Sequence, residues 1–133
     1  MKDIILMILS ILGGFIGWFL GDVNGLIYTL IAFVMCDYIT GVMVAIINKK
    51  LSSEVGFKGI FRKVLIFILV GCGNLLDVYF ITEGSVMRTA VIFFYLSNEG
   101  ISLLENVGNI GLPFPQKLKK LLVQLNEREV EEE

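Results

Sequence analysis

The sequence has no histidine, and only 18% of its 133 residues are charged. Without histidine, the chain lacks histidine-based metal sites, catalytic triads with an imidazole base, and imidazole proton relays. No other pairing of a nucleophile with a base is evident, so we expect no enzyme activity and no cofactor. The net charge of −2 gives no basic excess of the kind that nucleic-acid-binding proteins carry, so we expect no nucleic-acid partner.

Cysteine is also scarce. The two cysteines, Cys36 and Cys72, both lie inside apolar stretches. A thiol in apolar surroundings behaves as a small hydrophobic group. We therefore predict no disulfide and assign no redox compartment.

The low charge content is local, because long apolar runs alternate with short charged connectors. About 20 apolar residues in a helix span the roughly 30 Å core of a bilayer. We predict an all-α integral membrane protein with four transmembrane helices, at residues 4–20, 26–47, 64–81 and 86–104. The fourth run is the least apolar, since it contains Arg88, Asn98 and Glu99. An alternative with three spans therefore stays open, in which residues 86–106 lie at the membrane surface.

The connector after the second run determines the expected topology. Residues 48–63 form a predicted cytoplasmic loop with one acidic residue and five basic ones: Lys49, Lys50, Lys58, Arg62 and Lys63. The positive-inside rule places such a loop in the cytoplasm, and four spans then put both termini there too. The first run could instead be a signal peptide. It is longer than a usual signal core, and no small-x-small cleavage site follows it, so we expect it to remain as a span.

The chain divides into two predicted regions, a transmembrane domain at residues 1–106 and a cytoplasmic segment at residues 107–133. In the second region, leucines repeat at helical spacing opposite lysines, at Leu118, Leu121, Leu122 and Leu125. This pattern predicts a short amphipathic helix that lies on the anionic inner leaflet or packs on a partner helix. The acidic residues at the end, 127–133, are predicted to form a disordered tail.

Polar residues recur on one side of each later predicted span. The candidates for an intramembrane polar site or pore lining are Asp37, Thr40, Asn74, Asp77, Arg88, Asn98 and Glu99. Ionisable residues at membrane depth avoid lipid and are candidates for function. A short turn between the third and fourth runs would let Arg88 pair with Asp77. Asp37 and Glu99 could be satisfied by protons, water, a ligand or another subunit, so the polar stripes either close a bundle internally or face water or a second chain.

Glycine is spaced regularly in the first run. Gly13, Gly17 and Gly21 recur every four residues and so fall on one narrow helix face. Small residues at this spacing let two helix backbones approach closely in lipid. We predict that this face packs against another helix, of the same chain or of another.

Three stretches carry a more specific pattern. They are DYITG at residues 37–41, KKLSSEVGFKGIFRK at residues 49–63, and FFYLSNEGISLLENVGNIGLPFPQKLKKLL at residues 93–122. Together with Asp77 and Arg88, they resemble the bacteriophage lysis and toxin-secretion holin family of Gram-positive bacteria and their phages. The resemblance covers about residues 26–125, which is most of the chain.

This resemblance implies a small multi-pass protein of the bacterial cytoplasmic membrane that forms homo-oligomers in the lipid bilayer and then makes lesions in it. Such lesions release an endolysin, which lyses the host cell, or export a toxin, and neither cargo need form a stable complex with the protein. One alternative is an antiholin of the same family, including a product that starts at Met7. Another is a small ion or proton channel or transporter that uses the buried carboxylates.

Overall fold

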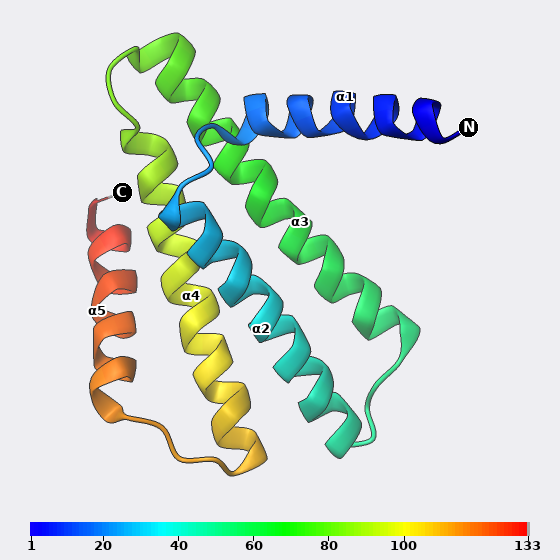
Figure 1. Ribbon diagram of the computed structural model, residues 1–133. Helices are drawn as coiled ribbons and strands as arrows, with labels where there is room; N and C mark the ends of the chain where they lie inside the picture. Colours follow the sequence, from blue (N-terminus) through cyan, green and yellow to red (C-terminus); the bar gives the residue numbers. More distant parts are fainter. Residues whose placement is uncertain (133) are drawn as a thin grey trace.

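The computed structural model describes residues 1–132, with side chains described through residue 127. These residues form helices and no strand: α1 Lys2–Leu20, α2 Gly25–Ile47, α3 Ser53–Leu76, the π-helical η1 Asp77–Ile81, α4 Val86–Ile110 and α5 Gln116–Glu132 (Figure 1). The prediction of an all-α protein is therefore confirmed. Three helical segments of the described chain are long and apolar enough to cross a membrane, namely α1, α2 and the continuous α3–η1.

The helices do not lie as four aligned spans. Helices α2, α3, α4 and α5 run alongside one another, whereas α1 runs across one end of this bundle (Figure 1). The connectors α2–α3 and α4–α5 both lie at the opposite end of the bundle (Figure 1). No residue of α1 is buried against the rest of the described chain, and this helix meets the bundle only near its C-terminal end, at α3 and at Arg88 of α4.

Polar side chains fix where the bundle helices begin. Asn24 accepts hydrogen bonds from the backbone N–H groups of Leu26 and Ile27 at the start of α2. Ser52 accepts one from the N–H of Val55 at the start of α3. Both residues are favoured N-caps, because a short side-chain oxygen satisfies N–H groups that have no partner inside the helix.

The predicted basic loop was too long. Helix α3 begins at Ser53, so only residues 48–52 connect α2 to α3, and Lys58, Arg62 and Lys63 lie on the helix. Two features explain the difference. Ser52 caps the helix earlier than the apolar run begins, and the residues that follow include good helix formers and no proline.

Helix α4 is the central helix of the bundle. Every residue from Arg88 to Leu104 is buried or partly buried, because α2, α3 and α5 all pack against α4. The apolar core lies between α2, α3 and α4, at Ile27, Leu30, Val34, Ile66, Val70 and Ile92. This enclosure explains why α4 tolerates more polar residues than its neighbours, since its side chains face protein rather than the surroundings.

Helix α5 packs on α4, which is one of the two placements predicted for the amphipathic helix. Leu122 is 6% exposed and lies against Gly100 of α4. One turn further along α5, the Ser97 hydroxyl donates to Asn126 Oδ1 at 3.5 Å. The predicted disordered tail was wrong for residues 127–132, since α5 continues to Glu132; Glu133 lies outside the described residues.

Replacing Gly100 with leucine is expected to loosen α5 from α4. A Cβ at this position would lie 2.9 Å from Leu122 Cδ1 and 3.2 Å from Phe33 Cε2, so a larger side chain has no room. Overpacking of this kind costs about 1–3 kcal/mol. Limited proteolysis should therefore remove α5 faster than in the parent. The control is Gly25→Leu, where a Cβ meets no described atom within 4 Å; equal cleavage of the two variants would contradict the packing role of Gly100.

Candidate functional site

A buried ion cluster joins the three inner helices of the bundle. Lys63 Nζ of α3 lies 2.5 Å from Asp37 Oδ2 of α2 and 2.6 Å from Glu99 Oε2 of α4. The two carboxylate side chains are 7% and 8% exposed, and the lysine side chain is 20% exposed. One ammonium group thus holds two carboxylates, each from a different helix, and bonds to ionised groups are among the strongest hydrogen bonds in proteins.

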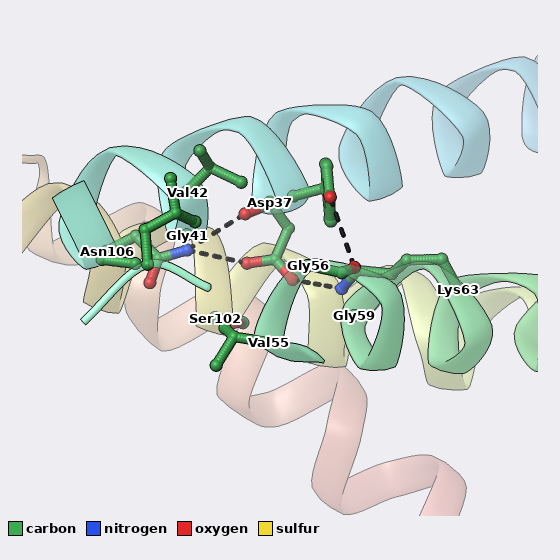
Figure 2. A pocket seen from close by; sticks show the side chains of 12 residues that line it. Asp37, Gly41, Val42, Val55, Gly56, Gly59, Lys63, Ser102 and Asn106 are labelled. Carbon is green, nitrogen blue, oxygen red and sulfur yellow. Dashed lines mark hydrogen bonds and ion pairs between the residues drawn. The ribbon is translucent and has the colours of Figure 1, made fainter. Parts of the chain in front are cut away.

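Asn106 of α4 orients Asp37 from the other side. Its Nδ2 donates to Asp37 Oδ1 at 3.0 Å, to the Asp37 carbonyl at 3.2 Å and to Thr40 Oγ1 at 3.0 Å. Figure 2 shows the Asp37 carboxylate between Asn106 and Lys63, with bonds to both. The carboxylate is therefore fixed from two helices.

Two cavities open onto the ion cluster. The first, of about 220 Å³, extends along α2 and α3 past Tyr38, Gly41 and Val55 (Figure 2). The second, of about 560 Å³, lies between α3 and α4. Asp37 and Lys63 line both cavities. The cluster thus lies largely buried between the helices and has space beside it that is large enough for water.

The predicted ion pair between Asp77 and Arg88 was wrong. Both Asp77 carboxylate oxygens instead accept backbone N–H groups at the start of α4, from Met87 at 2.9 Å and Arg88 at 2.8 Å. The physical reason is local. The short turn after η1 brings the N-terminus of α4 next to Asp77, and unpaired helix N–H groups are strong donors to a carboxylate.

Arg88 uses its guanidinium group on the linker between α1 and α2. Nε donates to the Leu20 carbonyl at 2.7 Å, and Nη2 donates to the Asp22 carbonyl at 2.6 Å. Asn74 Nδ2 donates to the carbonyls of Trp18 and Phe19, at 3.3 and 3.1 Å. This second polar network therefore fixes the C-terminal end of α1 to α3 and α4.

The seven predicted polar residues thus separate into three groups. Asp37, Thr40 and Glu99 meet in the ion cluster, whereas Asn74, Asp77 and Arg88 form the network at the end of the bundle next to α1. Asn98 lines the larger cavity. The predicted polar site did not include Asn106, nor Lys63, which was assigned to the cytoplasmic loop. Lys63 lies on the same helix face as the buried residues Ile66 and Val70. This spacing would have identified Lys63 as an inward-facing residue if the predicted helix had begun at Ser53.

The predicted glycine face is free of contacts within the described chain at two of its three positions. A Cβ at Gly13 or Gly17 would meet no described atom within 4 Å. Gly21 instead ends α1 with a positive φ of 86°, and a Cβ there would lie 2.5 Å from Asn74 Oδ1. Gly21 is thus needed for the turn rather than for a helix face.

The basic residues predicted for the cytoplasmic loop have two different roles. Lys49, Lys50, Lys58 and Arg62 are exposed, and among the described residues none of them forms an ion pair. Lys63 is the exception, because it turns inward to the ion cluster. The described residues also contain no group of three Cys, Asp or Glu side chains placed to hold a metal ion.

Comparison with known proteins identifies the family. The sequence profile of the bacteriophage holin family matches residues 14–127. The chain belongs to this family. A probable holin of Bacillus phage phi105 is 39% identical to this holin-family chain over 79 residues, which are 59% of this chain and 58% of the phage protein.

Other relatives match over more of the length. An uncharacterized protein of Listeria monocytogenes is 40% identical over 121 residues, covering 91% of this chain and 86% of the relative. An uncharacterized 14.9 kDa protein from the nagH 3' region of Clostridium perfringens is 38% identical over 117 residues, covering 88% and 89%. No solved structure matches significantly. The resemblance to the holin family that the sequence motifs indicated is thus confirmed.

Proposed function

We propose that this protein is a holin that oligomerises in the bacterial cytoplasmic membrane and forms lesions through which an endolysin, or in some settings a toxin, crosses. Family membership supports a holin-like role. The observation that carries the proposal is that the bundle has one charged flank and one apolar flank, both running along the length of the helices.

The charged flank is α5. Most of its exposed residues are polar, at Lys117, Lys119, Lys120, Gln124 and Glu127, and Leu118 and Leu121 are exposed beside them. Helix α5 lies beside α4, and so at the same depth as the apolar α2 and α3 (Figure 1). A charged residue at the bilayer centre costs about 2.5–3.5 kcal/mol on insertion scales, so this flank does not face lipid.

The apolar flank is formed by the outward sides of α2 and α3. Its exposed residues include Met35, Ile39 and Met43 of α2 and Leu65 and Ile68 of α3. An arrangement of several copies places these sides against lipid and brings the α5 flanks together around water. Assembly removes the cost of charge in lipid, which gives a physical reason for a homo-oligomer with an aqueous centre.

The proposed topology follows from the two connectors at one end of the bundle. Residues 48–52 and 111–115 lie at the same end (Figure 1); the first connector contains Lys49 and Lys50, and Lys117 follows the second. The positive-inside rule assigns this end to the cytoplasm. Helices α2, α3 and the enclosed α4 then cross the bilayer. Insertion of α1 as a fourth span, with a cytoplasmic N-terminus, requires it to rotate about residues 21–24.

Inducible expression in a bacterium tests the proposal. Membrane potential and culture density are recorded with and without a co-expressed endolysin. We expect growth followed by an abrupt loss of potential, and lysis only when the endolysin is present. Steady growth with ion or solute uptake would instead indicate a channel or transporter. An antiholin would cause no loss of potential when expressed alone, and it would delay the lysis caused by a second, co-expressed holin.

A further inference from the structure

The larger of the two cavities has a polar end and an apolar end. It has a volume of about 560 Å³ and lies between α3 and α4. Arg62, Asn98 and Ser102 line the polar end, together with the ion cluster. Leu65, Ile66 and Leu69 of α3, together with Tyr95 of α4, line the other end. Such a division suits an amphipathic ligand, because burial of the apolar part and hydrogen bonding of the polar part occur in one site.

Two side chains at the polar end are free to bind. Among the described residues, neither the Arg62 guanidinium nor the Asn98 amide has a hydrogen-bond partner. A guanidinium offers a planar set of donors that matches the oxygens of a phosphate group. Arg62 therefore supplies an unused cation beside the cavity.

The same end also holds surplus negative charge. Asp37 and Glu99 share the single ammonium group of Lys63, so the three residues together carry one negative charge when ionised. Only one oxygen of Glu99 is bonded to Lys63 among the described residues. With Arg62 included, the polar end presents one spare cation and one spare anion and is neutral overall. This combination complements a headgroup that carries both a phosphate and an ammonium group.

The cavity is oriented as a lipid in the bilayer would be. Arg62 directly precedes the long apolar stretch of α3 and lies beside the ion cluster, on the cytoplasmic side of Leu65 and Leu69 in the proposed topology. Leu69 lies seven residues after Arg62, or about 10 Å further along the helix. The order from phosphate contact to apolar wall along α3 thus follows the order from headgroup to acyl chain in a membrane leaflet.

We propose that this cavity binds a glycerophospholipid whose headgroup pairs a phosphate with a primary ammonium group, as in phosphatidylethanolamine. Arg62 and Asn98 donate to the phosphate oxygens, and the free oxygen of Glu99 accepts from the ammonium. One acyl chain lies along Leu65 and Leu69. The proposal concerns lipid binding by the folded chain and does not depend on lesion formation.

Native mass spectrometry of the full chain in detergent tests this site. Phosphatidylethanolamine, phosphatidylcholine and phosphatidylglycerol with the same acyl chains are titrated separately, and inorganic phosphate with free ethanolamine serves as the soluble competitor. We expect phosphatidylethanolamine to bind about fivefold more tightly than phosphatidylcholine, whose quaternary ammonium has no N–H to donate. Equal binding of these two lipids, tightest binding of phosphatidylglycerol, or displacement of lipid by the soluble competitor would overturn the proposal.

Variants test which residue binds the phosphate and which binds the ammonium of the headgroup. Arg62→Gln should weaken phosphatidylethanolamine and phosphatidylcholine alike, by about fivefold, because both lipids lose the same phosphate contact. Glu99→Gln should remove the preference between them. Lys58→Gln, which removes an exposed cation outside the cavity, is the matched control and should leave both affinities unchanged. If Glu99→Gln does not fold, Arg62→Gln still tests the site, because Arg62 is exposed. A loss of lipid affinity in Arg62→Gln no larger than in Lys58→Gln would refute the site.

Discussion

Replacing Lys63 with methionine is expected to destabilise the folded bundle more than any other single change in the ion cluster. Methionine has a similar length but no charge, so Asp37 and Glu99 are left facing each other without a cation. Removing one partner of a buried ion pair costs about 3–5 kcal/mol, because it leaves an uncompensated buried charge. That is a large fraction of the roughly 5–15 kcal/mol by which a folded protein is stable.

Thermal unfolding of the purified chain in detergent measures this effect, and the yield in the membrane fraction gives a second readout. Lys58→Met is the matched control, because it removes an exposed lysine of the same helix that has no ion pair among the described residues. Asp37→Asn and Glu99→Gln should cost less, since each leaves Lys63 with one carboxylate. The triple variant without any of the three charges should recover stability relative to Lys63→Met. Equal stability of Lys63→Met and Lys58→Met would show that the cluster does not hold the helices together.

Replacing Arg88 with lysine is the second change expected to have a large effect. Arg88 is 3% exposed, and its guanidinium bonds to the carbonyls of Leu20 and Asp22 at the same time. A single ammonium group on a differently shaped chain cannot reproduce this planar pair of bonds. Each hydrogen bond to a charged group contributes about 1.5–3 kcal/mol, so we expect a loss of about 2–4 kcal/mol.

The loss should be greatest at α1, because Arg88 and Asn74 are the polar side chains that fix its C-terminal end to the bundle. Protease cleavage at residues 21–24 should therefore be faster in Arg88→Lys than in the parent, while the α2–α4 core remains protected. Arg62→Lys makes the same chemical change at an exposed position and is the control. Cleavage of Arg88→Lys at the rate of Arg62→Lys would contradict the proposed role of Arg88.

The helices were the part of the fold most accessible from sequence. The apolar run at residues 26–47 predicted α2 Gly25–Ile47 almost to the residue, because apolar length and the Asn24 cap both act locally. The start of α3 was missed for the opposite reason. Its first turns carry basic residues, which the positive-inside rule assigns to the cytoplasmic side, and we therefore predicted a loop there. The helical spacing of Lys63 with the apolar face of α3 indicates instead that the helix already includes this residue.

The partners of the buried charges could not be predicted in the same way. The short separation of Asp77 and Arg88 in the sequence suggested a side-chain ion pair. The Asp77 carboxylate instead accepts hydrogen bonds from the backbone N–H groups at the start of α4. The guanidinium of Arg88 bonds to residues 66 and 68 positions away in the sequence. Contacts of this kind depend on how the whole bundle packs, and no local spacing in a single sequence encodes them.

The placement of the terminal helices also depends on tertiary packing. The leucine spacing predicted an amphipathic helix after residue 115, yet it left both a lipid surface and a partner helix as possible contacts. In the structure the partner is α4, because Gly100 has no side chain and leaves room for Leu122 to pack against this helix. The apolar length of α1 likewise predicted a helix but not that it would cross the end of the bundle (Figure 1).

Release from reconstituted vesicles tests the central claim most directly. The purified chain is incorporated into vesicles that contain both a small dye and a folded fluorescent protein, and the escape of each is followed as the protein density in the membrane increases. Our account predicts that, above a threshold density, dye and folded protein leave the same vesicles together. Escape of the dye while the folded protein stays inside at every density would contradict it and would show that the protein is a channel for small solutes.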